Sequence, residues 1–138
     1  MAYYGFSQKI LAGEAIEVYG EGKMARDFTY IDDIVDGIIG VLDHPAAHGE
    51  ARVFNIGDSR PVGLMDMIAI LERALGREAV KRMRPMQPGD VTATFADISR
   101  LNALCGYAPK VTLEAGLPKF VEWYQTFQRD SVEASSPL

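Results

Sequence analysis

The chain has 138 residues, of which 48% are hydrophobic and 24% charged, and its formal net charge is -5. This size and balance are typical of one soluble globular domain. Its apolar runs are shorter than the ~20 residues that cross a bilayer, and its acidity argues against general nucleic-acid binding, which depends on phosphate neutralisation. With no signal peptide pattern and a single cysteine, Cys105, we expect a cytoplasmic protein without an internal disulfide.

Short apolar patterns predict a helix and two strands at the start of the chain. Apolar residues at helical spacing indicate an amphipathic helix over residues 1–12, with Gly13 as its stop. Alternation predicts a strand over 16–19, and residues 27–30 form a second extended piece. The glycines of 20–22 predict a hairpin turn between the two.

Two longer helices flank the next predicted strand. A broad apolar stripe predicts a helix over 31–42, and a similar face predicts a helix over 64–75 that stops at Gly76. Between them the apolar run 53–56 predicts a buried strand. The members of the first stripe are Ile31, Ile34, Val35, Ile38, Ile39 and Leu42.

The last third of the chain predicts one extended segment and two more helices. Residues 91–95 are expected to be extended, and Asp97 can cap a short helix that ends at residue 104. A final helix is predicted over 113–128. Because Pro118 lacks an amide hydrogen, this helix is expected to become regular only near Leu117.

The order of the elements predicts an α/β fold in one domain. Helices and strands alternate over residues 1–129 with no internal repeat or linker. Residues 130–138 are polar, have nothing to bury and are expected to be disordered.

Several motifs together resemble a known enzyme family. The run RDFTYIDD at 26–33 opens the helix over 31–42, and further matches lie at 12–20, 53–57, 86–91 and 120–124. The set resembles NAD-dependent nucleotide-sugar epimerases and dehydratases, the extended short-chain dehydrogenases, and UDP-glucuronate epimerases most of all. The resemblance is to the C-terminal, substrate-binding part of that family, which implies a small mixed sheet with helices and no Rossmann half.

The chemistry of the resembled family resides in its Rossmann half, and the chain lacks the corresponding motifs. Residues 20–22 have no third glycine at the dinucleotide-binding offset and no helix is predicted after them, so we expect no NAD site in this chain. The spacing of Tyr19 and Lys23 matches the family's catalytic Tyr-x-x-x-Lys. Two glycines between them oppose a helix, so we expect no catalytic residues here.

The candidate substrate-binding residues lie in two of the motifs. A guanidinium offers paired donors to phosphate oxygens, and the resemblance implies that Arg26 contacts the diphosphate of a UDP-sugar. The structural alternative is a salt bridge to Asp27, Asp32 or Asp33. By the same resemblance, Tyr19 lies beside the uracil ring and the backbone of Val18 bonds to it. Gln87 and Asp90 can face the ribose and phosphate.

Other charged residues have simpler interpretations. Many relatives carry arginine at the position of Gln87. This chain therefore has a neutral side chain where those relatives have a second cation for the diphosphate, unless Arg82 or Arg84 replaces it. These two belong to a basic tract that is either a solvated strand edge or an anion-binding rim. Asp32 and Asp33 fall in the first turn of a helix, where carboxylates cap exposed amides, and no histidine joins them to form a metal site.

The resemblance implies a parent reaction and leaves several roles open for this chain. The reaction is C4 epimerisation of UDP-glucuronate through a 4-keto intermediate, with NAD as the cofactor of the parent family. We expect the chain alone to be inactive and to bind a UDP-sugar weakly. It would be a truncated piece, a remnant or half of a split enzyme, completed by a missing Rossmann half or by forming a homo-oligomer. The alternatives are a non-catalytic UDP-sugar sensor or assembly module, or part of a related dehydratase or decarboxylase.

Overall fold

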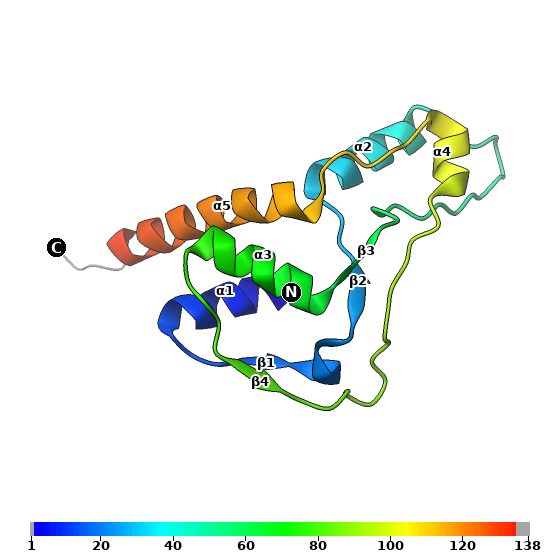
Figure 1. The fold of residues 1–138 in the computed structure, drawn as a ribbon. Coiled ribbons are helices and arrows are strands. Elements are labelled where there is room, and N and C mark those ends of the chain that lie inside the picture. The colour runs from blue at the N-terminus through cyan, green and yellow to red at the C-terminus, as the bar shows by residue number, and fades with distance from the viewer. Residues whose placement is uncertain (1, 135–138) are drawn as a thin grey trace.

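The computed structural model describes residues 2–134 and has a mixed α/β architecture with small sheets, as predicted (Figure 1). Three helices, α1 (Ala2–Ala12), α3 (Leu64–Leu75) and α5 (Leu113–Ala134), pack together as one layer, with α3 against both of the others. Below them lies a parallel pair of strands, β1 (Ile16–Val18) and β4 (Lys81–Met83).

An arm that carries α2 (Ile31–Leu42) and α4 (Ser99–Cys105) extends from this layer (Figure 1). A 3-10 turn, η1 (Tyr19–Gly22), leads from β1 to β2 (Ala25–Asp27), which pairs antiparallel with β3 (Pro61–Gly63). Beyond this second sheet, α2 packs against α4. The β2–β3 pair thus joins the arm to the helical layer.

The main hydrophobic core lies between the helical layer and β1. Periodic apolar positions on each helix face inward, so the stripe of α3 meets those of α1 and α5. Its buried members are Ile10, Ile16, Val18, Met67, Ile68, Ile70, Leu71, Leu75, Leu117 and Val121. The core therefore fixes the start of the β1–η1 segment, where two candidate site residues lie.

The predictions for α2 and α3 are confirmed at both ends. Each helix has the predicted bounds, and Gly76 ends α3 in the left-handed conformation with φ 66°. The final helix begins at Leu113, earlier than Pro118 suggested, because the Thr112 carbonyl accepts the amides of the first turn. It continues through Ala134, into the tail predicted to be disordered, and residues 135–138 lie outside the described chain.

The predicted hairpin at residues 20–22 is wrong. β1 pairs with β4 and β2 pairs with β3, so the turn connects strands of different sheets. Gly20, Glu21 and Gly22 all have positive φ, between 52° and 72°, and this tight left-handed turn redirects the chain instead of folding it back. The second extended piece is also shorter and earlier than predicted, ending at Asp27.

The predicted buried strand at 53–56 is also absent from the described structure. The segment has no strand assignment, and Val53 is 75% exposed. An apolar run becomes a strand only when another strand supplies backbone partners, and none of the described strands lies beside it. Likewise, residues 91–95 make a single bridge, from Ala93 to Ala25.

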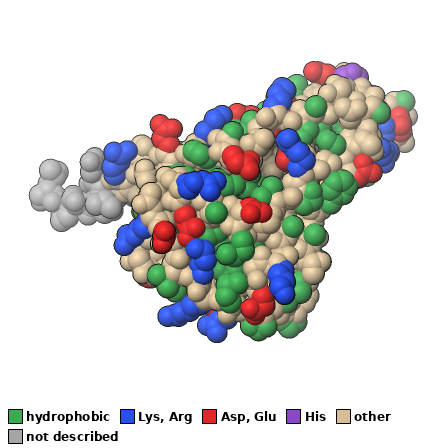
Figure 2. All heavy atoms as spheres, in the orientation of Figure 1, with side chains coloured by type: hydrophobic (Ala, Val, Ile, Leu, Met, Phe, Trp, Pro, Cys, Tyr) green, Lys and Arg blue, Asp and Glu red, His purple; other side chains and the backbone are tan. Residues whose placement is uncertain are grey.

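The apolar stripe of α2 faces solvent, not the core. The buried residues of α2, Asp33 and Gly37, lie on its opposite side. The exposed members of the stripe are Ile31, Val35, Ile38, Ile39 and Leu42. Figure 2 shows hydrophobic side chains scattered among charged ones over the arm that carries this helix.

Candidate functional site

Arg26 and Asp90, 64 positions apart in the chain, meet in an ion pair. Arg26 is the middle residue of β2, in register with Val62 of β3. Its Nη2 lies 2.6 Å from Asp90 Oδ1, and its Nη1 donates to the carbonyl of Ala25 at 2.8 Å. The alternative salt bridges to Asp27, Asp32 or Asp33 are not formed.

The turn that carries Tyr19 lies next to this ion pair. Val18 is fully buried, and its carbonyl accepts the Arg84 N–H at 2.8 Å. Tyr19 is half-buried and opens η1, so Tyr19 and Lys23 do not share the face of a helix, which a catalytic tyrosine–lysine pair requires. Met24 packs against Gly20 and places its Sδ 3.7 Å from Arg26 Nη2.

Gln87 and Asp90 lie in one turn at the rim of the same region. The Asp90 N–H donates to the Gln87 carbonyl at 3.1 Å, and Gly89 has φ 83°. The Gln87 side chain is exposed. Arg26 thus contacts Asp90, whose turn also carries Gln87, whereas the turn that follows Val18 and Tyr19 reaches Arg26 only through Met24.

The two additional cations of the basic tract pair with Glu17 on the neighbouring strand. Arg84 forms a hydrogen-bonded ion pair with Glu17, and Arg82 lies 3.9 Å from the same carboxylate. The hydrogen bond from Arg84 lowers the pKa of Glu17 and raises that of Arg84. Figure 2 shows basic side chains along the lower edge, where β4 lies. Both guanidiniums remain at least half-exposed.

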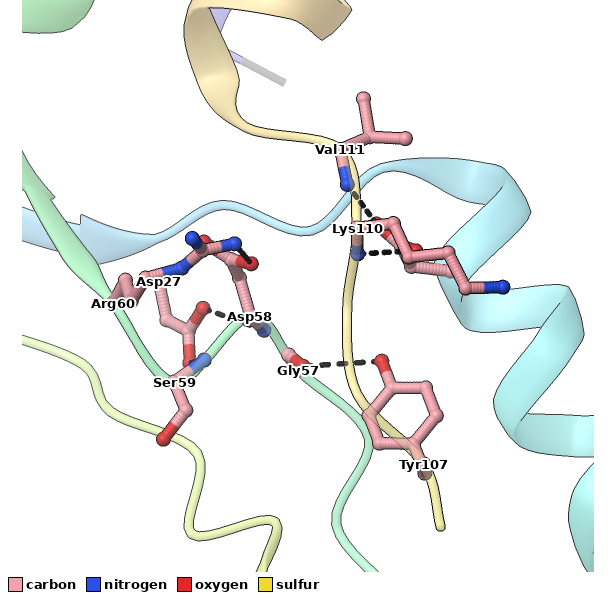
Figure 3. A network of polar contacts seen from close by, with 9 residues as sticks. Asp27, Gly57, Asp58, Ser59, Arg60, Tyr107, Lys110 and Val111 are labelled. Carbon is pink, nitrogen blue, oxygen red and sulfur yellow. Dashed lines mark hydrogen bonds and ion pairs between the residues drawn. The ribbon is translucent and has the colours of Figure 1, made fainter. Parts of the chain in front are cut away.

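The role of Asp27 was not predicted: this residue of β2 holds the loop before β3 and the segment before α4 (Figure 3). Its carboxylate accepts three backbone N–H groups, from Asp58 at 2.9 Å, Ser59 at 3.1 Å and Ala96 at 2.9 Å. A Cβ at Gly57 would lie 3.0 Å from Asp27 Oδ2 and 2.3 Å from the Cβ of Ala96. The one available signal was an aspartate at the start of the predicted extended piece 27–30, beside Phe28.

A buried carboxylate, Asp58, and a buried phenol, Tyr107, lie close to Asp27 (Figure 3). Asp58 accepts both Arg60 Nε, at 3.1 Å, and Arg60 Nη2, at 2.6 Å, and this bonding raises the pKa of Arg60. The Tyr107 hydroxyl donates to the Gly57 carbonyl at 3.1 Å. Burial, reinforced by the surrounding aspartates, raises the pKa of Tyr107 to about 12.

The capping role predicted for Asp33 is wrong. Asp33 is 2% exposed, and its carboxylate accepts the N–H groups of Lys110 at 2.9 Å and Val111 at 3.0 Å, not those of its own helix. Asp36, one turn later, pairs with the Lys110 ammonium at 2.9 Å. Asp32 is exposed, as a first-turn carboxylate can be. The face of α2 opposite its stripe therefore holds the segment that leads into α5.

A separate apolar groove of about 710 Å³ lies between α5 and the segment that links β2 to α2. The ammonium of Lys119 lies 5.0 Å from the ring centre of Tyr30 within it. Trp123, 54% exposed, stacks on Phe127. Apolar lining residues include Phe28, Ile31, Ile34, Leu113, Leu117 and Phe120. The groove does not include Arg26 or Asp90, so it is distinct from the predicted site.

Among the described residues, no helix start that closely follows a strand is suited to the pyrophosphate of a dinucleotide. η1 leads into a strand and not a helix, and the helices that follow strands carry Asp32, Asp33 and Asp66 in their first turns, where they would repel a pyrophosphate. No three His, Cys, Asp or Glu side chains within the described range gather as a metal site. None of the helices in residues 2–134 combines the length and apolar character needed to cross a bilayer.

Comparisons with known proteins agree with the architecture. Residues 3–57 match the NAD dependent epimerase/dehydratase family. An uncharacterized protein of Methanocaldococcus jannaschii is 48% identical over 124 residues, which are 90% of this chain and 37% of that protein. A probable UDP-glucuronate 4-epimerase of Rhizobium meliloti is 42% identical, over 94% of this chain and 43% of its own.

A solved structure gives the same result in three dimensions. The UDP-glucuronic acid 4-epimerase of Bacillus cereus, in complex with UDP-glucuronic acid and NAD, superposes with a TM-score of 0.83 at 31% identity, covering 92% of this chain and 40% of the epimerase. The chain spans about two fifths of the length of these relatives. Over this span the chain is similar to members of the NAD-dependent epimerase/dehydratase family.

Proposed function

We propose that this chain provides the UDP-sugar-binding surface of an NAD-dependent epimerase that interconverts UDP-glucuronate and its C4 epimer through a 4-keto intermediate. The supporting observation is the position of Arg26, at the centre of β2 and beside the turn that carries Tyr19. Relatives described as UDP-glucuronate 4-epimerases, and one solved in complex with UDP-glucuronic acid and NAD, support the choice of substrate.

In this proposal each site residue has a distinct role. The guanidinium of Arg26 binds the diphosphate through charge-assisted hydrogen bonds, each worth roughly 1.5–3 kcal/mol. The ring of Tyr19 provides a flat surface for the uracil, and the Val18 backbone bonds to its edge. Gln87 and Asp90 approach the ribose from the exposed turn.

On its own the chain binds substrate and does not catalyse. Tyr19 and Lys23 lie in a 3-10 turn followed by a strand, and among the described residues no helix start that closely follows a strand is suited to the pyrophosphate of NAD. Incubation with NAD and UDP-glucuronate is expected to give no C4 epimer above the blank. Turnover that is abolished by Tyr19→Phe would contradict this part of the proposal.

An assembly role is the second candidate, supported by the exposed stripe of α2. The stripe adjoins the apolar groove, because Ile31 and Ile34 line the groove and belong to the same helix. Exposed apolar surface of this kind marks interaction sites. We propose that it is covered by a second copy of the chain.

Titration of backbone amide chemical shifts with UDP tests the binding role. A dissociation constant between high micromolar and millimolar, about -4 to -5 kcal/mol, is expected for one charged anchor and a few neutral bonds. Arg26→Ala is expected to remove most of the binding. Arg73→Ala, which deletes an exposed arginine on α3, is the matched control and is expected to leave it intact. If amides near Tyr19, Arg26 and Asp90 do not move at millimolar UDP, the chain does not bind UDP.

A further inference from the structure

The segment from residue 85 to residue 91, here called the strap, is held by backbone bonds just outside both ends. Before it, the Arg84 N–H donates to the Val18 carbonyl at 2.8 Å, and the Arg84 carbonyl accepts the Glu21 N–H at 3.1 Å. After it, the Thr92 carbonyl accepts the Ala25 N–H at 2.9 Å. The strap therefore crosses from the edge of one sheet to the edge of the other.

Between these anchors, one polar contact joins the strap to the other described residues. The bond from the Asp90 N–H to the Gln87 carbonyl is internal to the strap, as is the bond from the Val91 N–H to Asp90 Oδ1 at 2.9 Å. The external contact is the ion pair between Asp90 and Arg26, at 2.6 Å. The same guanidinium is the proposed anchor for a ligand diphosphate.

Carboxylate and phosphate oxygens are alternative partners for a guanidinium, because both accept charge-assisted hydrogen bonds from the same N–H groups. Arg26 uses Nη1 for the Ala25 carbonyl and Nη2 for Met24 and Asp90. A diphosphate that takes Nη2 must therefore displace Asp90 Oδ1. The two side chains are 27% and 30% exposed, and a partly exposed pair of this kind is weak enough to exchange.

We infer that Asp90 is a built-in counter-ion of Arg26, which a pyrophosphoryl group displaces, and that this exchange releases the strap. The inference rests on the proposed binding function and specifies the role of Asp90 in it. Displaced from Arg26, the Asp90 carboxylate becomes available to a ribose hydroxyl. Asp90 is thus a positioning residue. It holds the guanidinium of Arg26 in place, and an anion that takes Nη2 must break this ion pair.

Inorganic pyrophosphate separates this role from contact with the ribose, because it has no sugar. Asp90→Asn removes the competing charge and keeps the shape, so it is expected to tighten pyrophosphate binding by about two- to fivefold. Glu78→Gln is the matched control: it makes the same charge change at an exposed residue between α3 and β4, and is expected to alter the affinity little. In Arg26→Ala the Asp90→Asn change is expected to give no gain.

Amide chemical shifts provide the second measurement. In the unmodified chain, pyrophosphate is expected to move the amides of residues 86–91 toward the positions that they have in Asp90→Asn. If the unmodified chain binds UDP but Asp90→Asn leaves pyrophosphate binding unchanged or weaker, the inference is wrong and the proposed binding function stands. If neither UDP nor pyrophosphate moves the amides near Arg26, the binding function itself fails.

Discussion

Asp33 and Val111 are joined across 78 positions of sequence: the Asp33 carboxylate accepts the Val111 N–H at 3.0 Å, just before α5 begins. The other oxygen of Asp33 accepts the Lys110 N–H. One buried side chain on α2 thus fixes the segment that enters the longest helix. Because α5 also contributes Leu117 and Val121 to the main core, this contact couples the arm to the helical layer.

Asp33→Asn is expected to lower the free energy of unfolding by about 2–3 kcal/mol, because the amide can present one carbonyl oxygen and turns an NH2 group toward a buried donor. Urea unfolding followed by circular dichroism measures the change. The matched control is Asp32→Asn, an exposed neighbour, which is expected to cost less than about 1 kcal/mol through the helix dipole. Equal losses of unfolding free energy in the two variants would show that the charge at the helix N-terminus, and not the bonds of Asp33 to the segment before α5, accounts for the effect.

Gly37→Ala is expected to destabilise the chain, although alanine is the better helix former by about 1 kcal/mol. A Cβ at Gly37 would lie 2.9 Å from Ile56 Cγ2 and 3.2 Å from Tyr107 Cε2, so the arm would have to repack at a cost of about 1–3 kcal/mol.

Gly5→Ala on α1 is the control for Gly37→Ala. Apart from its chain neighbours and the backbone of α1, no atom of the described residues lies within 4 Å of its added Cβ, so it is expected to stabilise the chain by about 0.5–1 kcal/mol. Thermal unfolding of the two variants is expected to shift in opposite directions. A rise in Tm for Gly37→Ala would mean that α2 does not pack closely on residue 56.

Stability is expected to fall in alkaline solution partly through Tyr107. Its pKa is raised to about 12 in the folded chain by burial, against about 10 when unfolded, so its contribution is complete below pH 10 and is lost as the pH rises through 12. The full loss is about 2–3 kcal/mol. Tyr107→Phe cannot titrate and is expected to show a shallower decline, measured by urea unfolding over this range.

At neutral pH, Tyr107→Phe is expected to cost only about 1 kcal/mol, through the lost bond to the Gly57 carbonyl. The unfolding free energies of the variant and the unmodified chain should therefore converge as the pH rises and then cross, because the alkaline loss exceeds the starting difference. Parallel curves would show that the phenol keeps its proton equally well when the chain is unfolded.

The sequence predicts what depends on local periodicity and fails where distant segments must meet. α2 and α3 have the bounds that their apolar stripes and Gly76 indicate, because a helix satisfies its own backbone bonds. The run 53–56 carries an apolar pattern that does not specify a partner strand, and it forms none here. Composition likewise does not reveal which face of α2 would be buried.

The candidate site shows the same division. The resemblance to a family, and not residue spacing, suggested that Arg26 and Asp90 share a site, and the fold places them in contact. Asp27 could not be found this way, because the backbone N–H groups that it binds come from residues 31 to 69 positions later. Backbone donors leave no signature in the identity of the residue that carries them.

Self-association through α2 is the last prediction. Five apolar side chains of this helix are exposed on one face, and covering them with a second copy would remove that surface from water. Light scattering is expected to show a mass that rises from monomer toward dimer with concentration. Ile38→Lys places a charge at the centre of the stripe and is expected to keep the chain monomeric, whereas Val80→Lys, at an exposed apolar residue outside the stripe, is not. If the measured mass stays that of a monomer at every concentration, a second copy does not cover the stripe, and a different protein chain is the expected partner.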